Sequence, residues 1–350
     1  MANGEYRNLS NQEYWIKRSE EVVDKHWKDI KNVEKEMAKQ YRIALEDIRQ
    51  MVIDLFTKYA KENALSYKEA IKNLTQAELG DYQAKIARLR RQIEQTQDPF
   101  LIAEMEKLQK AAKLNRLQAL LGQIMARLLQ LGYEQQNTIM QWLVKVFKSN
   151  YYQTIYQLQV GTGLGIGFAQ LNEAAVKEAI THPWSGDMFS DRIWDNKNAL
   201  VRQLRQTITQ GLIKGLSVQK MAKEIKNAMN NSYSNALRLV RTETAYVIGE
   251  STYQGYKQSG YMYQYIYLAT LDSRTSPICR KLDNKVYKLE EKQVGVNYPP
   301  LHPNCRSAVA PYFNGDELKE SVRIARGEGK ETYYVPANMT YAEWHKQYVK

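Results

Sequence analysis

The chain has 350 residues, of which 43% are hydrophobic and 25% charged, and it carries a formal net charge of +12. This balance excludes a disordered chain and allows two or three domains, each with its own core. No apolar run approaches the roughly 20 residues that cross a bilayer, and the polar N-terminus lacks the apolar core of a secretory signal. Two cysteines are too few for a disulfide framework. We therefore expect a protein made in a cytoplasm, with no membrane partner.

The N-terminal part of the chain is predicted to be helical. Over residues 12–62, apolar residues recur every three or four positions, which is typical of one long amphipathic helix with room for a single break. Two pairs with capping-box spacing follow, Ser66 with Glu69 and Thr75 with Glu78. We expect helices to restart at both places.

Two further helices are expected over residues 81–97 and from Asp98 onward. Asp98-Pro99 offers an N-cap followed by a proline at the first helical position. The second of these helices is predicted to stop near Gly132, and another is predicted over residues 134–156. A pair of long helices joined near Asp98 could form a coiled-coil hairpin or an exposed stalk.

A glycine-rich stretch at residues 161–167 changes the character of the chain. Its alternating glycines resemble a phosphate-binding loop only superficially, because no Lys-Ser or Lys-Thr pair follows. We interpret it as a flexible joint or a close-packing turn.

Three amphipathic helices are predicted next, at about 197–211, 217–229 and 233–258. From Lys197 to Arg241 the chain carries nine basic residues and one acidic residue, a net charge of +8. A concentrated positive charge attracts polyanions, such as nucleic acid or an acidic protein surface. Of these partners we expect double-stranded DNA, bound without sequence preference. The alternative is a solvated helix face on a basic protein. The candidate DNA-binding residues are Lys197, Arg202, Arg205, Lys214, Lys220, Lys223 and Lys226.

Strand-like alternation appears only late in the chain. Residues 261–268 place tyrosines on one face and other side chains on the opposite face, and short strands are also predicted at 286–289 and 307–310. Beyond Phe313 the chain is charged and less regular, like a tail or arm.

The predicted fold class is mainly α, with long N-terminal helices followed by a smaller α+β domain with a short sheet. The expected segments are a long-helix domain or stalk, a glycine-containing linker region, a helical domain with a small sheet, and a C-terminal tail or arm. They cover residues 1–160, 161–196, 197–313 and 314–350.

A stiff loop at Pro299–Arg306 contains three prolines, one histidine and one of the two cysteines. Proline fixes φ and removes a backbone donor, so the loop is neither helix interior nor central strand. Together with Cys279 it offers three soft metal ligands, Cys279, His302 and Cys305. A structural zinc site normally has four ligands, and here only one close pair is complete.

Several interpretations of these residues remain open. Asp272 or Asp283 could complete a zinc site, the two cysteines could form a disulfide, or both could be buried free thiols, which we favour. A cysteine hydrolase needs an orienting group beside its histidine, for which Asn304 and Asp283 are candidates. One stiff loop holds both His302 and Cys305, so their side chains could diverge instead of meeting.

Arg241 and Glu243 lie within a predicted helix and are too close in sequence to pair along one face. Each needs a partner elsewhere, and Asp272 and Arg274 on a later loop are natural candidates. We favour a buried ion network that attaches the helix to the proline-rich loop over a catalytic role.

These motifs, in this order, resemble the phage Mu F-like minor head protein family, also called phage head morphogenesis proteins. The resemblance covers about residues 235–313. Ser276 and Ser307 stand where the family often has additional cysteines. The matching residues are Arg241-Thr242-Glu243, Asp272-Ser273-Arg274-Thr275, Cys279, Leu282, Asp283 and Pro300-Leu301-His302-Pro303-Asn304-Cys305-Arg306.

The resemblance implies a minor capsid protein inside the virion head of a tailed phage, associated with the portal protein and acting in head assembly or DNA delivery. The major capsid protein or a scaffolding protein would be further partners. We expect no catalytic residue and no cofactor, with zinc at the two cysteines and the histidine as the open alternative. The residues expected to form a structural motif are Arg241, Glu243, Asp272, Arg274, Cys279, Asp283, His302, Cys305 and Arg306.

Two other hypotheses belong to different classes of protein. Some relatives carry toxin domains, so an enzyme of the ADP-ribosyltransferase or metal-dependent hydrolase type could use Arg241, Glu243, Asp272 and His302. Convergence of these side chains on an open pocket would favour the enzyme. The other hypothesis is a host-encoded helical adaptor.

Overall fold

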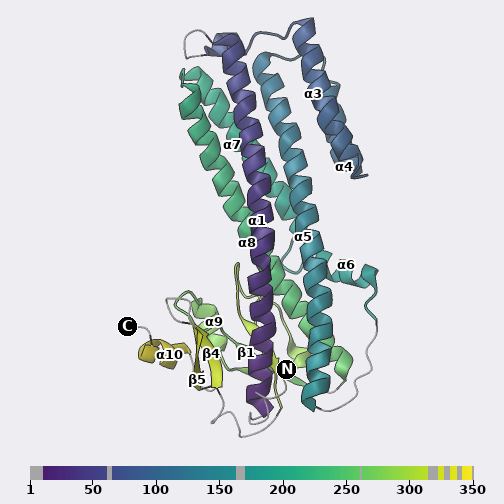
Figure 1. Ribbon diagram of the computed structural model, residues 1–350, viewed down its shortest axis with the longest axis vertical. Helices are drawn as coiled ribbons and strands as arrows, with labels where there is room; N and C mark the ends of the chain where they lie inside the picture. Colours follow the sequence, from purple (N-terminus) through teal and green to yellow (C-terminus); the bar gives the residue numbers. More distant parts are fainter. Residues whose placement is uncertain are drawn as a thin grey trace. The chain divides into compact units, whose positions relative to one another are not determined.

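The structure is a computed structural model that is mainly helical, with long N-terminal helices and a small C-terminal sheet of three antiparallel strands (Figure 1). This agrees with the predicted fold class. None of the described helices is both long enough and apolar enough to cross a lipid bilayer. The structure describes residues 11–60, 65–162, 170–260, 262–313, 322–326, 332–336 and 341–348.

The chain forms two compact units, each built from stretches that are distant in sequence. The division into segments with boundaries at residues 160, 196 and 313 remains a prediction. Unit 1 comprises Met1–Asn32, Met140–Met188 and Arg238–Lys350, and unit 2 comprises Val33–Ile139 and Phe189–Leu237.

The first helices begin at the predicted caps. Helix α1 (Asn11–Tyr59) is continuous, and residues 61 and 62 of the predicted helix lie outside the described residues. Helix α2 (Tyr67–Ala70) begins after Ser66, whose hydroxyl accepts a hydrogen bond from the backbone of Glu69. Helix α3 (Gln76–Glu94) begins at a complete capping box of Thr75 and Glu78, as predicted, and includes most of the helical run expected over residues 81–97.

Helices α3 and α4 (Pro99–Gln109) form a hairpin joined at Gln97-Asp98, as predicted. The Asp98 carboxylate accepts hydrogen bonds from the backbone N–H groups of Phe100 and Leu101 at 3.0 and 3.2 Å. The prediction that the second helix continues to Gly132 is wrong, because α4 ends at Gln109.

A second start signal explains this break. Helix α5 (Arg116–Thr162) begins after Asn115, whose side chain accepts from the backbone of Gln118 at 2.8 Å while the Gln118 side chain accepts from the backbone of Asn115 at 2.9 Å. This reciprocal pair acts as a capping box, and its spacing was present in the sequence.

Helix α5 passes through Gly132 without interruption, so the predicted stop there is also wrong. A Cβ added to Gly132 would lie 2.6 Å from the Trp194 ring. The glycine therefore permits close packing of an indole ring against the helix.

Three helices were predicted from residue 197 onward, and the structure has two in their place, α7 (Phe189–Ile213) and α8 (Val218–Ser259). The expected break between residues 229 and 233 does not occur. Ser232, a polar residue in that region, is buried, and its backbone carbonyl accepts from Asn196 at 2.9 Å. Helix α6 (Glu173–Thr181) lies in the segment expected as a linker, while residues 163–169 lie outside the described residues.

The three predicted strands are confirmed with shifted ends. Strand β1 (Gln264–Leu268) lies between β2 (Val286–Lys288) and β3 (Ala308–Pro311), both antiparallel to it. Both faces of β1 are buried: Tyr265 and Tyr267 belong to one apolar cluster, and Ile266 and Leu268 to another. The cysteines belong to the tyrosine side.

The segment expected as a tail contains regular elements. Strands β4 (Val322–Arg326) and β5 (Thr332–Pro336) pair antiparallel, and helix α10 (Tyr341–Tyr348) follows. The side chains of Val335 and Trp344 are buried.

Candidate functional site

The first part of the candidate site is Cys279, which lies on the short helix α9 (Pro277–Leu282) in unit 1. Ser276 caps this helix, and its hydroxyl accepts from the backbone of Cys279 at 3.3 Å. Pro277 occupies the first helical position, where its missing N–H costs nothing. The cap and the proline thus orient the Cys279 side chain, which is buried.

The proline-rich loop is attached to helix α8 at two points. The backbone N–H of Asn304 donates to the Thr242 hydroxyl at 3.0 Å, and the Tyr298 hydroxyl donates to the carbonyl of Gly249 at 2.9 Å. Asn304 has φ 59°, a left-handed conformation that asparagine tolerates better than most residues. The Pro299–Pro300 peptide is cis.

These constraints bring the three soft ligands together. Cys279 Sγ lies 3.2 Å from His302 Nε2 and 3.7 Å from Cys305 Sγ, and all three donor atoms lie within 4.8 Å of one another. The side chains of His302 and Cys305 therefore meet, which resolves the possibility left open above that they diverge. The Tyr267 hydroxyl donates to Cys279 Sγ at 3.3 Å.

The pKa values of the two thiols are shifted in opposite directions. The pKa of Cys305 is lowered to about 6, because the Cys279 thiol donates to its sulfur and the backbone N–H groups of Leu301 and Ser307 add further hydrogen bonds, which together outweigh burial. The contact with Cys305 raises the pKa of Cys279, and burial adds to this. The arrangement thus favours one thiolate and one thiol.

Asp272 pairs with Arg306. The Arg306 guanidinium donates to both carboxylate oxygens, with Nη2 to Oδ1 at 2.7 Å. The Thr275 hydroxyl and the Arg274 backbone donate to the same carboxylate at 3.1 and 3.0 Å. Burial alone would raise the pKa of Asp272, but the Arg306 cation outweighs it and the pKa is lowered.

Glu243 has a partner that sequence reasoning missed. The indole N–H of Trp184 donates to Glu243 Oε2 at 3.0 Å, and the Trp184 ring stacks on Tyr246 with centroids 5.0 Å apart. Trp184 lies in a loop distant in sequence, and no local pattern links it to Glu243. The motif residue Asp283 accepts from the backbone of Ala269 at 2.8 Å.

The residues that an enzyme would need are thus engaged separately. Glu243 binds Trp184, Asp272 binds Arg306, and His302 lies against Cys279. Arg241 is half-buried.

The predicted DNA-binding residues lie in unit 2, and the prediction is wrong for one of them, Lys197. Lys197 is buried, its ammonium donates to the Tyr41 hydroxyl at 2.6 Å, and burial lowers its pKa to about 7. It therefore cannot contact DNA. The other six residues, all exposed, are Arg202 and Arg205 on α7, Lys214 in the following turn, and Lys220, Lys223 and Lys226 on α8.

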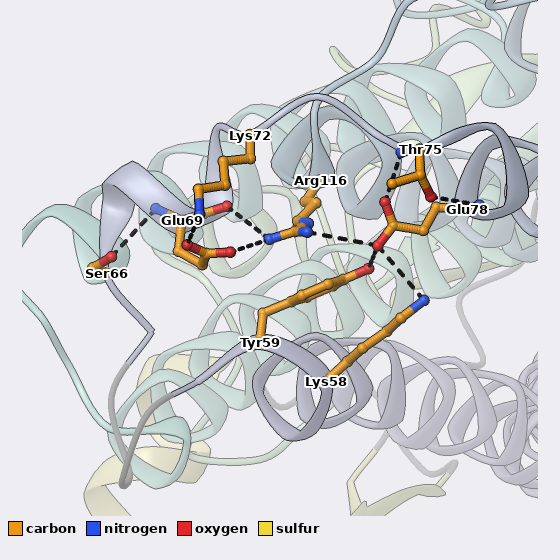
Figure 2. A network of polar contacts seen from close by, with 8 residues as sticks. All are labelled: Lys58, Tyr59, Ser66, Glu69, Lys72, Thr75, Glu78 and Arg116. Carbon is orange, nitrogen blue, oxygen red and sulfur yellow. Dashed lines mark hydrogen bonds and ion pairs between the residues drawn. The ribbon is translucent and has the colours of Figure 1, made fainter.

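Figure 2 shows a polar network of unit 2 that sequence reasoning missed. Arg116 bonds to Glu69, and its other terminal nitrogen lies 3.7 Å from Glu78. Its guanidinium stacks 3.7 Å from the centroid of the Tyr59 ring, whose hydroxyl donates to Glu78. A cation in the first turn of a helix is unfavourable for the helix dipole, and the distant carboxylates and the Tyr59 ring offset this cost at Arg116. Lys72 lies 2.5 Å from Glu69.

Comparison with known proteins shows what the chain resembles. The chain is 24% identical to the minor head protein GP7 of Bacillus phage SPP1 over 346 residues, covering 94% of this chain and 97% of that protein. It is 25% identical to the NAD(+)–arginine ADP-ribosyltransferase EFV of Enterococcus faecalis over 61% of this chain and 46% of that protein. No solved structure matches the chain. Residues 202–310 match the family of Phage Mu protein F like proteins, so the predicted resemblance to the phage Mu F-like minor head proteins is confirmed.

Proposed function

We propose that this chain is a minor head protein that acts in the assembly of a tailed-phage head and resides in the virion. The observation that carries the proposal is the match to a minor head protein over nearly the full length of both chains. A match of this extent includes the long helices as well as residues 202–310, and so supports a shared role for the whole protein.

We further propose that the protein associates with the portal protein during assembly. Quantitative mass spectrometry of purified procapsids tests this. Heads assembled by a phage that lacks its portal gene are the matched comparison. The expected result is a few copies per portal-containing head and strong depletion without the portal. Equal incorporation into both kinds of head would contradict portal association, and absence from heads would contradict the role in the virion.

A non-specific contact with double-stranded DNA is the third element of the proposal. Its support is the set of six exposed basic residues on α7, α8 and the turn between them. Arginine and lysine side chains bind phosphates and release counterions, which gives affinity without base recognition. The contact would therefore weaken steeply as salt concentration rises.

A charge-matched pair of variants tests the DNA contact. In one variant Arg202, Arg205, Lys220 and Lys223 become glutamine, and in the control the exposed Lys35, Lys39, Lys85 and Arg88 of the same unit become glutamine. For binding to a DNA duplex of random sequence, the slope of log K against log salt concentration should be less steep in the first variant by up to about 3–4. Each lost phosphate contact accounts for about 0.9. The control should keep the wild-type slope. Equal losses in both variants would reduce the effect to net charge.

The nine motif residues are proposed to have a structural role, in which the loop is attached to α8 and α9. The alternative enzymatic role receives less support. The chain spans less than half of the ADP-ribosyltransferase that it resembles, and three of the four candidate side chains, Glu243, Asp272 and His302, are engaged with separate partners.

A further inference from the structure

We propose that Cys279, His302 and Cys305 form a zinc-binding site with three protein ligands and a water molecule as the fourth. Among the described residues, these side chains are close enough to hold one metal ion. The inference is independent of the role in head assembly, because it rests on the chemistry of one loop and one helix.

The donor atoms have the spacing of a tetrahedral site. With Zn–S bonds of about 2.3 Å and Zn–N bonds of about 2.0–2.1 Å, tetrahedral angles separate two sulfurs by about 3.8 Å and a sulfur from a nitrogen by about 3.6 Å. The sulfurs of Cys279 and Cys305 are 3.7 Å apart, and Cys279 Sγ is 3.2 Å from His302 Nε2. One ion can therefore reach all three atoms with only small side-chain movements.

The histidine is oriented as a ligand. Its Nδ1 lies 2.8 Å from the carbonyl oxygen of Pro303. A carbonyl can only accept, so Nδ1 carries the proton, and in the neutral ring Nε2 presents its lone pair to the sulfurs. Metal-binding histidines commonly use the other ring N–H in this way, which fixes both the tautomer and the ring.

The cysteines are also prepared for a metal. Backbone N–H groups of Leu301 and Ser307 donate to Cys305 Sγ, as suits a metal-bound thiolate. Asn304 and Tyr298 tie the loop to α8 through hydrogen bonds that do not involve the three ligand side chains. The ligands are therefore ordered in advance, which reduces the entropy lost on binding.

The fourth position is assigned to water because the nearby carboxylates have other partners. Asp272 is paired with Arg306, and Asp283 accepts from the backbone of Ala269. His302 is half-buried, so the site has a solvent-facing side. Two thiolates and an imidazole suit zinc, whereas carboxylate and water ligands suit magnesium or calcium.

A disulfide between Cys279 and Cys305 is the main alternative to the zinc site. Its sulfurs would have to approach from 3.7 Å to about 2.05 Å. Such a bond would remove two of the three ligands, so the disulfide and the zinc site exclude each other.

The test uses the full chain, purified under reducing conditions and then dialysed against zinc or cobalt. We expect about one zinc per chain by elemental analysis, because three prepared ligands define one site. With Co²⁺ we expect a thiolate-to-cobalt charge-transfer band and the strong visible bands of a tetrahedral ion. Less than about one tenth of an equivalent of zinc, a cobalt spectrum without the thiolate band, or a disulfide in the reduced sample would overturn the proposal.

Variants connect the metal to the named residues. Cys305→Ser and His302→Ala should weaken zinc binding more than about 100-fold, since loss of outer partners alone costs 10–100-fold. His182→Ala, at an exposed histidine outside the cluster, should bind like wild type. If a cluster variant fails to fold, a mercurial thiol reagent added to the zinc-loaded wild type should release the ion. Retention of zinc by folded cluster variants, or after thiol modification, would contradict the assignment.

Discussion

Unit 2 and unit 1 both use ionic contacts to join segments that are far apart in sequence, but they differ in redundancy. In unit 2, Glu69 and Glu78 each contact a lysine as well as Arg116. In unit 1, the Asp272 carboxylate has Arg306 as a bidentate partner and Arg274 only at 3.6 Å, with an Arg274 side chain that is 78% exposed. Loss of one cation should therefore matter more in unit 1.

The largest effect is expected from Arg306→Ala. The variant leaves a mostly buried carboxylate without its main partner, which should lower the free energy of unfolding by about 3 kcal/mol. Urea denaturation followed by circular dichroism measures this. Arg274→Ala is the matched control and should cost less than about 0.5 kcal/mol, because exposed ion pairs contribute little. Equal costs for the two arginines would show that burial does not decide the effect.

Two glycine-to-alanine variants compare packing in the units. At Gly249 in unit 1 an added Cβ would lie 2.9 Å from the carbonyl oxygen of Pro299, so Gly249→Ala should destabilise by about 2 kcal/mol. At Gly80 in helix α3 of unit 2 an added Cβ meets nothing within 4 Å. Gly80→Ala should stabilise by about 0.5–1 kcal/mol through helix propensity. Thermal unfolding should show a lower melting temperature for Gly249→Ala and a higher one for Gly80→Ala. Shifts of the same sign would contradict the expected difference in packing between the two sites.

Removing Arg116 tests the redundancy of the network in unit 2. Arg116→Ala should cost about 1.5 kcal/mol, about half the effect of Arg306→Ala, because Glu69 and Glu78 keep their lysine contacts. Urea denaturation under the same conditions as for Arg306→Ala provides the comparison. A cost larger than that of Arg306→Ala would mean that the lysines do not compensate.

The smallest effect concerns the pH dependence of Lys197. Its pKa is about 7 in the folded protein and about 10.4 in an unfolded chain. Above pH 7 the unfolded chain binds more protons at this site, so stability rises with pH. Between pH 7 and pH 8 the wild type should gain about 1 kcal/mol relative to Lys197→Met. Urea denaturation at the two pH values measures the gain, and parallel pH profiles would contradict the burial of a titrating amine.

Local sequence signals determined where several helices begin. The Thr75 capping box and the Asp98-Pro99 start were both predicted, because a cap depends on residues within one turn. The pair Asn115 and Gln118 carried the same kind of signal, although the apolar periodicity around it favoured a continuous helix. The order of the motifs along the chain also indicated the resemblance to the phage Mu F-like proteins, because it depends on residue types and spacing alone.

Tertiary structure decided the features that depend on distant partners. Gly132 lies within a continuous helix, where it makes room for the Trp194 ring, and Lys197 is buried beside Tyr41 instead of facing solvent. Sequence reasoning grouped Asp272 and Arg306 in one motif, but only folding pairs them. A cap depends on its neighbours in sequence, whereas burial and ion pairing depend on which distant surfaces the fold brings together.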